Sequence, residues 1–407
     1  MKRRVVITGL GIWSSIGIDL NTVSKNLREG RSGIVYDEAR QELGIKCPYV
    51  GNVPTVNLRG YLSISQRRTM LNDVQYAYMA TKFALEDASI DDSYLKKNVV
   101  GVVVGYDGSM DGALDVVRTM DLFKDPIMLG PSSFFRWATS SPSMNLSSLF
   151  NLRGVSLSTG AACASSIHAL GVASLYIRAG LQDVIVVGGC ADPSCWSTVV
   201  ADALSVLATS EQQPQLASCP FDEEHNGMVP SGGAAILVLE EYNHAVERGA
   251  RIYAELVGYG CSTNGLDNLS SPDSDGELRA MECALDDAAL SIDDIDYICA
   301  HATSTIVGDR AEAIALNRLL NGRQIPIGST KSMTGHENWM AGASETIYSL
   351  LMMRDDFVAP TINVKNKIPE AENLYIPSVA IEKKLKFVMN NSFGLGGTNG
   401  CIILKKI

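Results

Sequence analysis

Short apolar runs alternate with longer segments of helical periodicity along much of the chain. Residues 4–8, 99–104 and 183–187 are rich in valine and isoleucine and have the length of buried strands. Residues 63–92 and 164–179 have helical patterns instead, and the second is rich in alanine, glycine and serine. Strands that alternate with helices in this way predict an α/β fold.

The pattern of the first half returns in the second half. Residues 84–88, Ala-Leu-Glu-Asp-Ala, are echoed by 284–288, Ala-Leu-Asp-Asp-Ala, and each segment precedes an apolar strand. A strand that ends on Gly-x-Gly likewise occurs at 3–11 and again at 251–260. These echoes predict two halves of similar structure. The expected halves are residues 1–250 and 251–407.

Further segments complete the expected order of elements. Residues 234–239 and 297–300 are expected to be strands, and 240–248 a charged helix. Residues 105–154 lack a clear period. We expect them to form an insertion with short helices, which either lines a pocket or an interface or packs as a surface loop.

The first apolar run is followed by Gly9-Leu10-Gly11, which superficially matches a dinucleotide-binding loop. Such a loop needs a third glycine at the position where this chain has Ser14. We therefore expect the two glycines to form a tight turn rather than a nucleotide site.

Composition narrows the class of protein. The 407 residues are 46% hydrophobic and 19% charged, which is typical of a compact folded chain. A formal net charge of −11 argues against nucleic acid as the main partner. Nine cysteines without zinc-type spacing predict reduced thiols, a cytoplasmic location and no structural metal. No apolar run reaches the length of a membrane span, so no membrane association is expected.

Residues 155–189 combine a strand, a turn of small residues, Cys163, a helix and a second strand. A cysteine at the start of a helix lies near unpaired backbone N–H groups, which stabilise a thiolate and can bind an oxyanion. The alternative is a small buried hydrophobic residue, because free cysteines are often buried. The turn has almost no side-chain bulk, but this segment alone leaves both interpretations open.

Two of the five histidines stand in runs of small residues. His301 precedes Ala-Thr-Ser-Thr, and His336 follows Lys331-Ser-Met-Thr-Gly. Such runs let a backbone and a substrate approach closely. One thiol and two imidazoles suit acyl transfer to the thiol, followed by stabilisation of a carbanion. The histidines expected to be structural are His168, His225 and His244.

These segments together resemble the β-ketoacyl-acyl carrier protein synthases, which are condensing enzymes of the thiolase superfamily. The resemblance spans almost the whole chain, from residues 3–11 to the glycine-rich segment 391–400. It is closest to the elongating types I and II, whose Cys-His-His set matches Cys163, His301 and His336. The resemblance implies the five-layered α-β-α-β-α thiolase fold, built from two similar halves.

The resemblance also implies a decarboxylating Claisen condensation. An acyl group from acyl carrier protein would be held on Cys163, and malonyl-carrier protein would lose carbon dioxide to supply the carbanion. The product would be a 3-oxoacyl chain, formed without a metal or an organic cofactor. The family forms homodimers, and Arg67 and Arg68 match a basic pair that docks the acidic carrier protein.

Roles for individual residues follow from the same resemblance. The two histidines would bind the malonyl thioester and promote decarboxylation. The backbone N–H groups of Cys163 and Leu395 would form the oxyanion hole, and Lys331 with Glu345 would be a charge pair that orients the site. The expected substrate-binding residues are Thr303, Thr305, Ser270, Phe393 and Leu395.

Four departures from the family pattern stand out. Ala302 replaces a glycine after the first histidine, and Leu395 replaces a phenylalanine that gates the acyl pocket. Residues 337–339, Glu-Asn-Trp, replace Leu-Leu-Gly after the second histidine, which is expected to alter the surroundings and the entrance of the site. Residues 225–233 are a weakened form of a family motif.

Two other functions stay open. A specialised ketosynthase of polyene or polyketide assembly would keep the same reacting residues and differ in chain preference. A non-catalytic partner subunit, like the chain-length factors, would keep the fold and usually lose the nucleophile. Because Cys163, His301 and His336 are all present, the elongating enzyme is the leading hypothesis.

Overall fold

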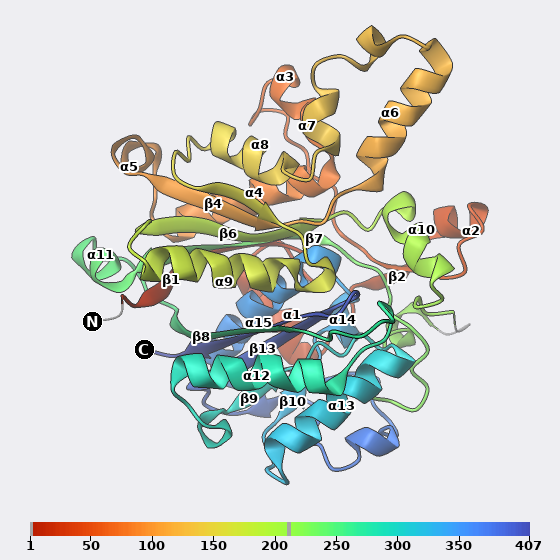
Figure 1. Ribbon diagram of the computed structural model, residues 1–407, viewed down its shortest axis with the longest axis vertical. Helices are drawn as coiled ribbons and strands as arrows, with labels where there is room; N and C mark the ends of the chain where they lie inside the picture. The colour runs from red at the N-terminus through yellow and green to blue at the C-terminus, as the bar shows by residue number, and fades with distance from the viewer. Residues whose placement is uncertain (1–2, 210–212) are drawn as a thin grey trace.

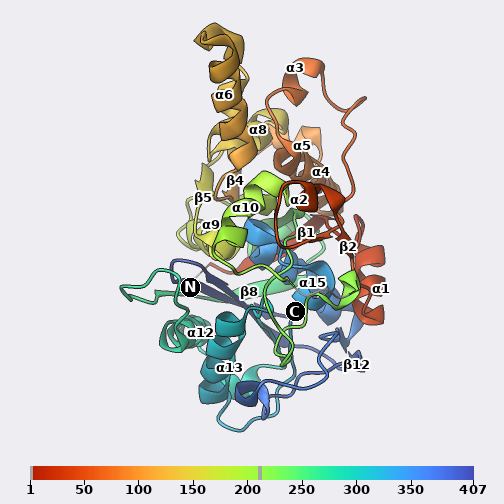
Figure 2. The same ribbon diagram turned by 90° about the vertical axis from the view of Figure 1, so that its right-hand side faces the viewer.

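Ten strands form the central sheet of the protein (Figures 1 and 2). The structure is a computed structural model that describes residues 3–209 and 213–407. The sheet strands of the first half are β1 (Val5–Trp13), β4 (Val100–Gly105), β5 (Ser156–Thr159), β6 (Val184–Ala191) and β7 (Gly233–Glu241). Those of the second half are β8 (Ala254–Thr263), β9 (Tyr297–Cys299), β10 (Ile327–Gly328), β13 (Phe387–Gly394) and β14 (Thr398–Lys405). The short pairs are β2 (Ile34–Tyr36) with β3 (Tyr49–Gly51) and β11 (Phe357–Val358) with β12 (Ile381–Glu382).

The two halves of the sheet have the same topology. The order β5-β4-β6-β7-β1 is followed by β8-β14-β13-β9-β10, so equivalent strands mirror one another. In each half the outer three strands are parallel and the inner strands antiparallel. The halves join where Val6 of β1 pairs with Glu255 of β8. The division of the chain at residue 250 stays a prediction, and β8 begins shortly after it.

Helices cover both faces of each half and give five layers, α-β-α-β-α (Figure 1). The outer layers are α4 (Asn72–Asp87) with α8 (Ser141–Leu149), and α12 (Ser274–Ala288) with α13 (Ile306–Leu320); the middle layer is α9 (Ser165–Arg178) with α15 (Ala341–Asp355). The remaining helices are α1 (Leu20–Glu29), α2 (Glu38–Glu42), α3 (Ile64–Arg67), α5 (Asp92–Lys97), α6 (Met110–Phe123), α7 (Ser133–Trp137), α10 (Cys195–Ala203), α11 (Tyr242–Glu247) and α14 (Lys331–Thr334). Within the part of the chain that the structure describes, no helix is long and apolar enough to cross a membrane.

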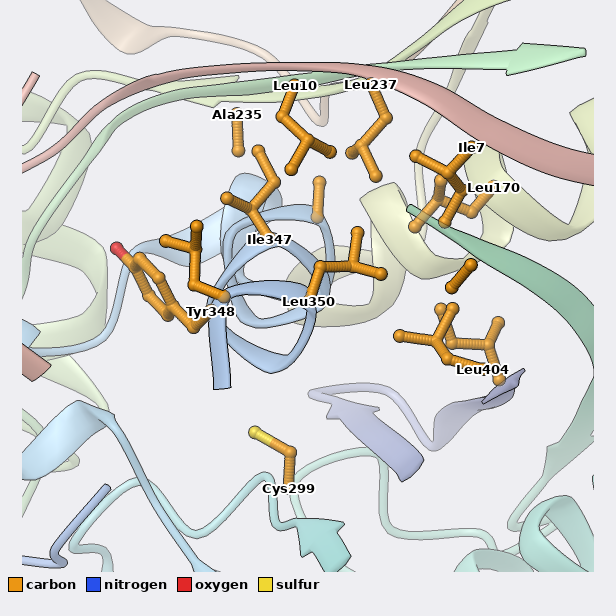
Figure 3. Close-up of a cluster of buried hydrophobic side chains, with 14 of the residues drawn as sticks. Ile7, Leu10, Leu170, Ala235, Leu237, Cys299, Ile347, Tyr348, Leu350 and Leu404 are labelled. Atoms are coloured by element: carbon orange, nitrogen blue, oxygen red, sulfur yellow. The ribbon is translucent and has the colours of Figure 1, made fainter. Parts of the chain in front are cut away.

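The middle layer forms the core that supports the site. Every residue of α15 from Ala341 to Met353 is buried. Figure 3 shows Ile347 and Leu350 of this helix on the side that faces Leu10 of β1 and Leu237 of β7. A helix buried on all sides has no polar face and therefore no amphipathic stripe.

Gly9 and Gly11 lie within β1 and allow α4 to pack directly on the strand. A Cβ atom added at Gly9 would lie 2.3 Å from the carbonyl oxygen of Ala84, and one at Gly11 would lie 1.9 Å from that of Ala80. Because the obstacle is helix backbone, no side-chain movement could relieve the overlap. The expected tight turn at these glycines is therefore wrong, since the strand continues through them.

The second half repeats this contact. Gly258 and Gly260 lie within β8, where added Cβ atoms would come within 2.4 Å and 2.1 Å of the carbonyl oxygens of Ala284 and Ala280 in α12. The two echoes noticed in the sequence, the Gly-x-Gly strand and the Ala-rich helix, are thus the two sides of one helix–strand contact.

Two expectations for the first half need correction. Residues 63–92, expected as one helix, contain α3, α4 and the start of α5, because Leu71 before α4 has extended backbone (φ −85°, ψ 177°). Ser63 and Gln66 form a capping box at the start of α3, so α3 is a separate helix from α4. The insertion at 105–154 contains α6, which has 14 residues and projects with the following segment from the rest of the molecule (Figure 2).

Candidate active site

Cys163 lies in a tight turn between β5 and α9. The turn is a single 3-10 segment, Ala162–Ala164, and α9 begins at Ser165. Ala162 has a left-handed backbone, φ 47°, and its N–H donates to Asp107 Oδ2 at 3.1 Å. A small residue in this conformation carries the chain sharply into the helix, so that the thiol of Cys163 lines the catalytic cavity described below.

His301 follows directly after β9, and a buried carboxylate holds its loop. The N–H groups of His301 and Ala302 donate to Glu312 Oε1 and Oε2 at 2.9 and 2.6 Å. The hydroxyl of Ser329 donates to the carbonyl oxygen of Ala302 at 2.7 Å. Glu312, in α13, is 1% exposed, so the imidazole is carried by a loop with little freedom.

His336 is fixed through its backbone. It follows α14 and Gly335, which has φ 72°. The N–H of His336 donates to the carbonyl oxygen of Val229 at 2.7 Å, and its carbonyl oxygen accepts from the N–H of Ser231 at 2.8 Å. The segment before β7 thus positions the second imidazole.

The three side chains meet in one place. His336 Nε2 lies 3.0 Å from Cys163 Sγ, and the rings of His301 and His336 stand edge to face with centroids 5.3 Å apart. One potential ligand atom from each of the three residues lies within 4.8 Å of the others. A thiolate and two imidazoles could also bind Zn²⁺ at this spacing, but such an ion would occupy the nucleophile and both hydrogen-bond donors.

A buried ion pair lies behind the three residues. Lys331 Nζ donates to Glu345 Oε1, and the two residues are 1% and 0% exposed. Thr330 Oγ1 is 3.4 Å from the same carboxylate oxygen. Burial has the larger effect on the imidazoles of His301 and His336, and the positive charge of Lys331 adds to it in lowering the pKa of both.

Burial raises the pKa of the Cys163 thiol and lowers the pKa of both imidazoles, which favours the uncharged form of each group. Burial raises the pKa of Cys163 to about 11, against the opposing effects of the N–H groups of Leu395 and Cys163 and of the charge of Lys331. Burial and Lys331 lower the pKa of His336 to about 3, and the pKa of His301 is also well below its usual value. Desolvation therefore outweighs the N–H groups of the turn, which by themselves would favour a thiolate. A neutral His336 can accept the thiol proton during attack.

The substrate-binding residues expected from the sequence share one cavity with the reacting groups. Thr303 Oγ1 and Thr305 Oγ1 lie 3.0 Å apart in its wall, and Leu395 is 40% exposed in the turn between β13 and β14. The N–H of Leu395 acts on the sulfur of Cys163. The predicted residues that line the cavity are Cys163, His301, His336, Thr303, Thr305, Ser270, Phe393 and Leu395.

Arg67 and Arg68 lie elsewhere. They stand at the end of α3 and line a separate surface hollow together with Arg59. This hollow and the catalytic cavity have no lining residue in common. The arginines therefore belong to the outer surface and not to the wall around the thiol.

Glu337 faces the core rather than the entrance. It is 1% exposed, and it accepts hydrogen bonds from Ser344 Oγ at 2.5 Å and from Tyr348 OH at 2.9 Å. Neither Glu337 nor Trp339 lines the catalytic cavity. The expectation that this departure alters the entrance is therefore wrong.

The other three histidines have structural contacts. His168 Nδ1 lies 2.8 Å from Tyr259 OH, which links α9 to β8. His225 Nδ1 lies 3.1 Å from Asp309 Oδ2 near the start of α13. His244 Nδ1 lies 2.5 Å from Glu240 Oε1. These contacts agree with the structural roles expected for them.

Sequence reasoning missed three acidic residues around the site. Asp107 accepts the N–H before the nucleophile, and Glu312 holds the loop of His301. Glu277, in α12, lines the same cavity. None of them stands in a run of small residues, so their position could be found only once the elements were packed together.

Comparison with known proteins identifies the family. The family described as Beta-ketoacyl synthase, N-terminal domain, matches residues 2–245, and Beta-ketoacyl synthase, C-terminal domain, matches residues 253–365. The chain belongs to the β-ketoacyl synthase family, and the thiolase-like fold predicted from the sequence is confirmed.

One relative and two solved structures match the chain over nearly their full length. The 3-oxoacyl-[acyl-carrier-protein] synthase 1 of Buchnera aphidicola subsp. Baizongia pistaciae is 39% identical over 408 residues, 99% of each chain. A beta-ketoacyl synthase from Burkholderia phymatum has a TM-score of 0.94 at 32% identity. The ishigamide ketosynthase/chain length factor has a TM-score of 0.92 at 29% identity. Each of these two matches covers 100% of this chain and 100% of the chain in the solved structure.

Proposed function

We propose that the chain is an elongating 3-oxoacyl-acyl carrier protein synthase, which condenses acyl-carrier protein with malonyl-carrier protein. The observation that carries the proposal is the 3.0 Å contact between His336 Nε2 and Cys163 Sγ, with His301 beside it in one cavity. An intact nucleophile with two neutral imidazoles argues against a non-catalytic partner subunit. We place the reaction in the cytoplasm, as the sequence predicts.

In the first half-reaction the acyl group moves to the enzyme. His336 Nε2 takes the proton of Cys163, and the sulfur attacks the thioester carbonyl. The N–H groups of Cys163 and Leu395, which already act on the sulfur in the resting site, receive the oxyanion. Collapse of the intermediate breaks the carbon–sulfur bond to the carrier, and the carrier thiolate takes back the proton.

In the second half-reaction malonyl-carrier protein enters the same cavity. Once Cys163 is acylated, His336 no longer accepts the thiol proton, and its neutral imidazole takes the tautomer with the proton on Nε2. The imidazole N–H groups of His301 and His336 then donate to the thioester carbonyl of the malonyl group. The bond to the carboxylate breaks, carbon dioxide leaves, and the electron pair forms an enolate that these donors stabilise. The enolate carbon attacks the acyl-Cys163 carbonyl and the carbon–sulfur bond breaks, which releases the 3-oxoacyl product and leaves Cys163 as a thiolate. The thiolate takes a proton from water, which restores the thiol.

The proposal is tested with pure protein and acyl-carrier proteins of graded chain length. Intact mass and peptide mapping should place the acyl group on Cys163. Addition of malonyl-carrier protein should release a 3-oxoacyl-carrier protein two carbons longer. Absence of an adduct with every chain tested would contradict the proposal.

A specialised ketosynthase of polyene or polyketide assembly is the second candidate. Leu395 favours it, because this side chain lies beside the thiol where family members commonly have a larger gate, and the ishigamide protein matches the whole fold. The same loading series separates the two candidates. Loading by ordinary saturated chains supports elongation, whereas loading by unsaturated or unusual chains alone supports the specialised enzyme.

We also propose a homodimer that binds acyl carrier protein through Arg67 and Arg68. Strand β5 ends the sheet and has Leu157 36% exposed, and a large apolar patch on a surface commonly marks an interface. The arginines supply a basic patch on an acidic chain. Sedimentation of the protein with and without carrier protein tests both partners. A monomeric protein would contradict the proposed homodimer. A complex with carrier protein that Arg68→Glu leaves unchanged would contradict the proposed docking site. The exposed large apolar residues of the projecting segment are Met110, Val117, Leu122, Phe123, Ile127, Met128, Phe134, Phe135 and Trp137.

A further inference from the structure

One buried carboxyl group in the catalytic cavity has no assigned role. Glu277 lies near the start of α12 and is 3% exposed, yet it lines the cavity that holds Cys163, His301 and His336. Its Oε2 atom is buried and has no hydrogen-bond partner among the described residues. A buried carboxylate without a donor is costly, so this group needs either a proton or a ligand.

The charges around Glu277 decide which of two neighbouring carboxyl groups holds a proton. The charged groups that act on it are Glu312 and Asp309 of α13 and Asp273 at the start of its own helix, and all three are acidic. Two carboxyl groups that share a buried site are driven apart in pKa, and the one with more hydrogen-bond donors ionises first.

Glu312 accepts hydrogen bonds from nearby donors, whereas Oε2 of Glu277 has no donor among the described residues. Glu312 accepts the N–H groups of His301 and Ala302 and lies 3.3 Å from Asn391 Nδ2. Burial raises the pKa of Glu312 to about 7 against these donors. Burial, followed by the charge of Glu312, holds the pKa of Glu277 well above its usual range. Glu277 is therefore the member of the pair that holds a proton more readily, because its buried Oε2 has no donor among the described residues.

The proposed reaction brings an anion into this cavity. The acyl thioester is uncharged where it reacts, but the malonyl group carries a carboxylate. The residues that line the cavity include no lysine or arginine, and Lys331 is paired with Glu345. Neutral donors must therefore meet the malonyl carboxylate. Glu312 also lines the cavity, but the N–H groups of His301 and Ala302 stabilise its charge, whereas an ionised Glu277 would add an unpaired negative charge that repels the substrate.

We propose that Glu277 is a specificity-determining residue for the anionic extender, and that its carboxylic acid donates a hydrogen bond to the malonyl carboxylate. This inference rests on the condensing function proposed above. The hydrogen bond is made to the bound carboxylate and is still in place as the carbon–carbon bond begins to break. It therefore stabilises the bound substrate and the transition state alike, and it lowers KM while leaving kcat nearly unchanged. Ionisation of Glu277 at alkaline pH turns the donor into a repelling charge.

The test uses protein already acylated on Cys163, so that the thiol does not titrate in the measured step. The rate of product formation is followed against malonyl-carrier protein concentration across neutral and alkaline pH. In the wild type, KM for malonyl-carrier protein should rise as pH rises, because ionisation removes the proton that donates. Glu277→Gln keeps a neutral donor, and its KM should stay flat. Glu277→Ala should raise KM about tenfold at neutral pH with kcat nearly unchanged.

Two controls separate the possible failures. Glu282→Gln makes the same chemical change at an exposed position of α12 and should behave as the wild type. Acyl loading of Cys163, which involves no carboxylate, is measured in all three variants and reports whether the site is folded. Equal pH profiles for the wild type and Glu277→Gln would overturn the inference while leaving the condensing function intact. A wild type that does not condense at all would overturn both.

Discussion

The Cys163→Ala protein forms no acyl adduct, and its condensation rate falls by about 10⁴-fold or more. The reason is geometric: Cys163 is the only cysteine among the cavity-lining residues, and its sulfur is the atom in contact with His336 Nε2. Loss of one sulfur atom leaves a small void, so the fold should persist. Intact mass after incubation with acyl-carrier protein, together with a thermal unfolding curve, checks both statements.

The chain offers a matched control for this prediction. Cys401 in β14 is also fully buried, and burial raises its pKa well above the usual value, but it does not line the cavity. Cys401→Ala should therefore load normally.

A comparison with His301→Ala separates the two half-reactions, because the hydrogen-bond contact to the sulfur comes from His336. That variant should still form the acyl adduct and fail to release carbon dioxide. Equal loss of loading in His301→Ala and Cys163→Ala would contradict the division of roles.

Much of the fold could be predicted because its elements have simple local patterns. The apolar runs at 99–104 and 183–187 correspond to β4 and β6, and the turn to helix at Cys163 lies where small residues permit it. The buried helix α15 could not be found in this way, since a helix buried on every side has no amphipathic period. The glycines of β1 were mistaken for a turn because what requires glycine there is the close packing of α4, which the local sequence does not show.

The site likewise divides into residues that a local sequence pattern reveals and residues that only the packing of elements brings in. His301 and His336 could be singled out because small residues surround them in the sequence. Glu277 and Glu312 sit in ordinary helical sequence, where an acidic residue is normally exposed. Only the packing of α12 and α13 against the sheet buries them. The sequence could not decide between a thiolate and a buried thiol at Cys163, because the burial of the sulfur depends on how the surrounding elements pack.

The substitution Lys331→Met should give the largest loss of stability among the site variants. It leaves the carboxylate of Glu345 buried without its cation, and breaking a buried ion pair in this way costs about 3–5 kcal/mol. Glu345 then takes up a proton, because burial alone raises its pKa. A raised pKa in the folded state gives stability that is present at low pH and is lost as pH rises through that pKa. Urea unfolding at acidic and neutral pH should therefore show a smaller deficit at the acidic pH.

The double variant Lys331→Met with Glu345→Gln separates the structural role of the pair from its electrostatic role. Removal of both charges should recover most of the lost stability, because no unpaired charge remains buried. Activity should not recover with it. Without Lys331 the pKa of Cys163 rises further, since that charge normally lowers it, and acyl loading should shift toward alkaline pH. A double variant that is stable and loads with the wild-type pH profile would show that the ion pair only fills the core.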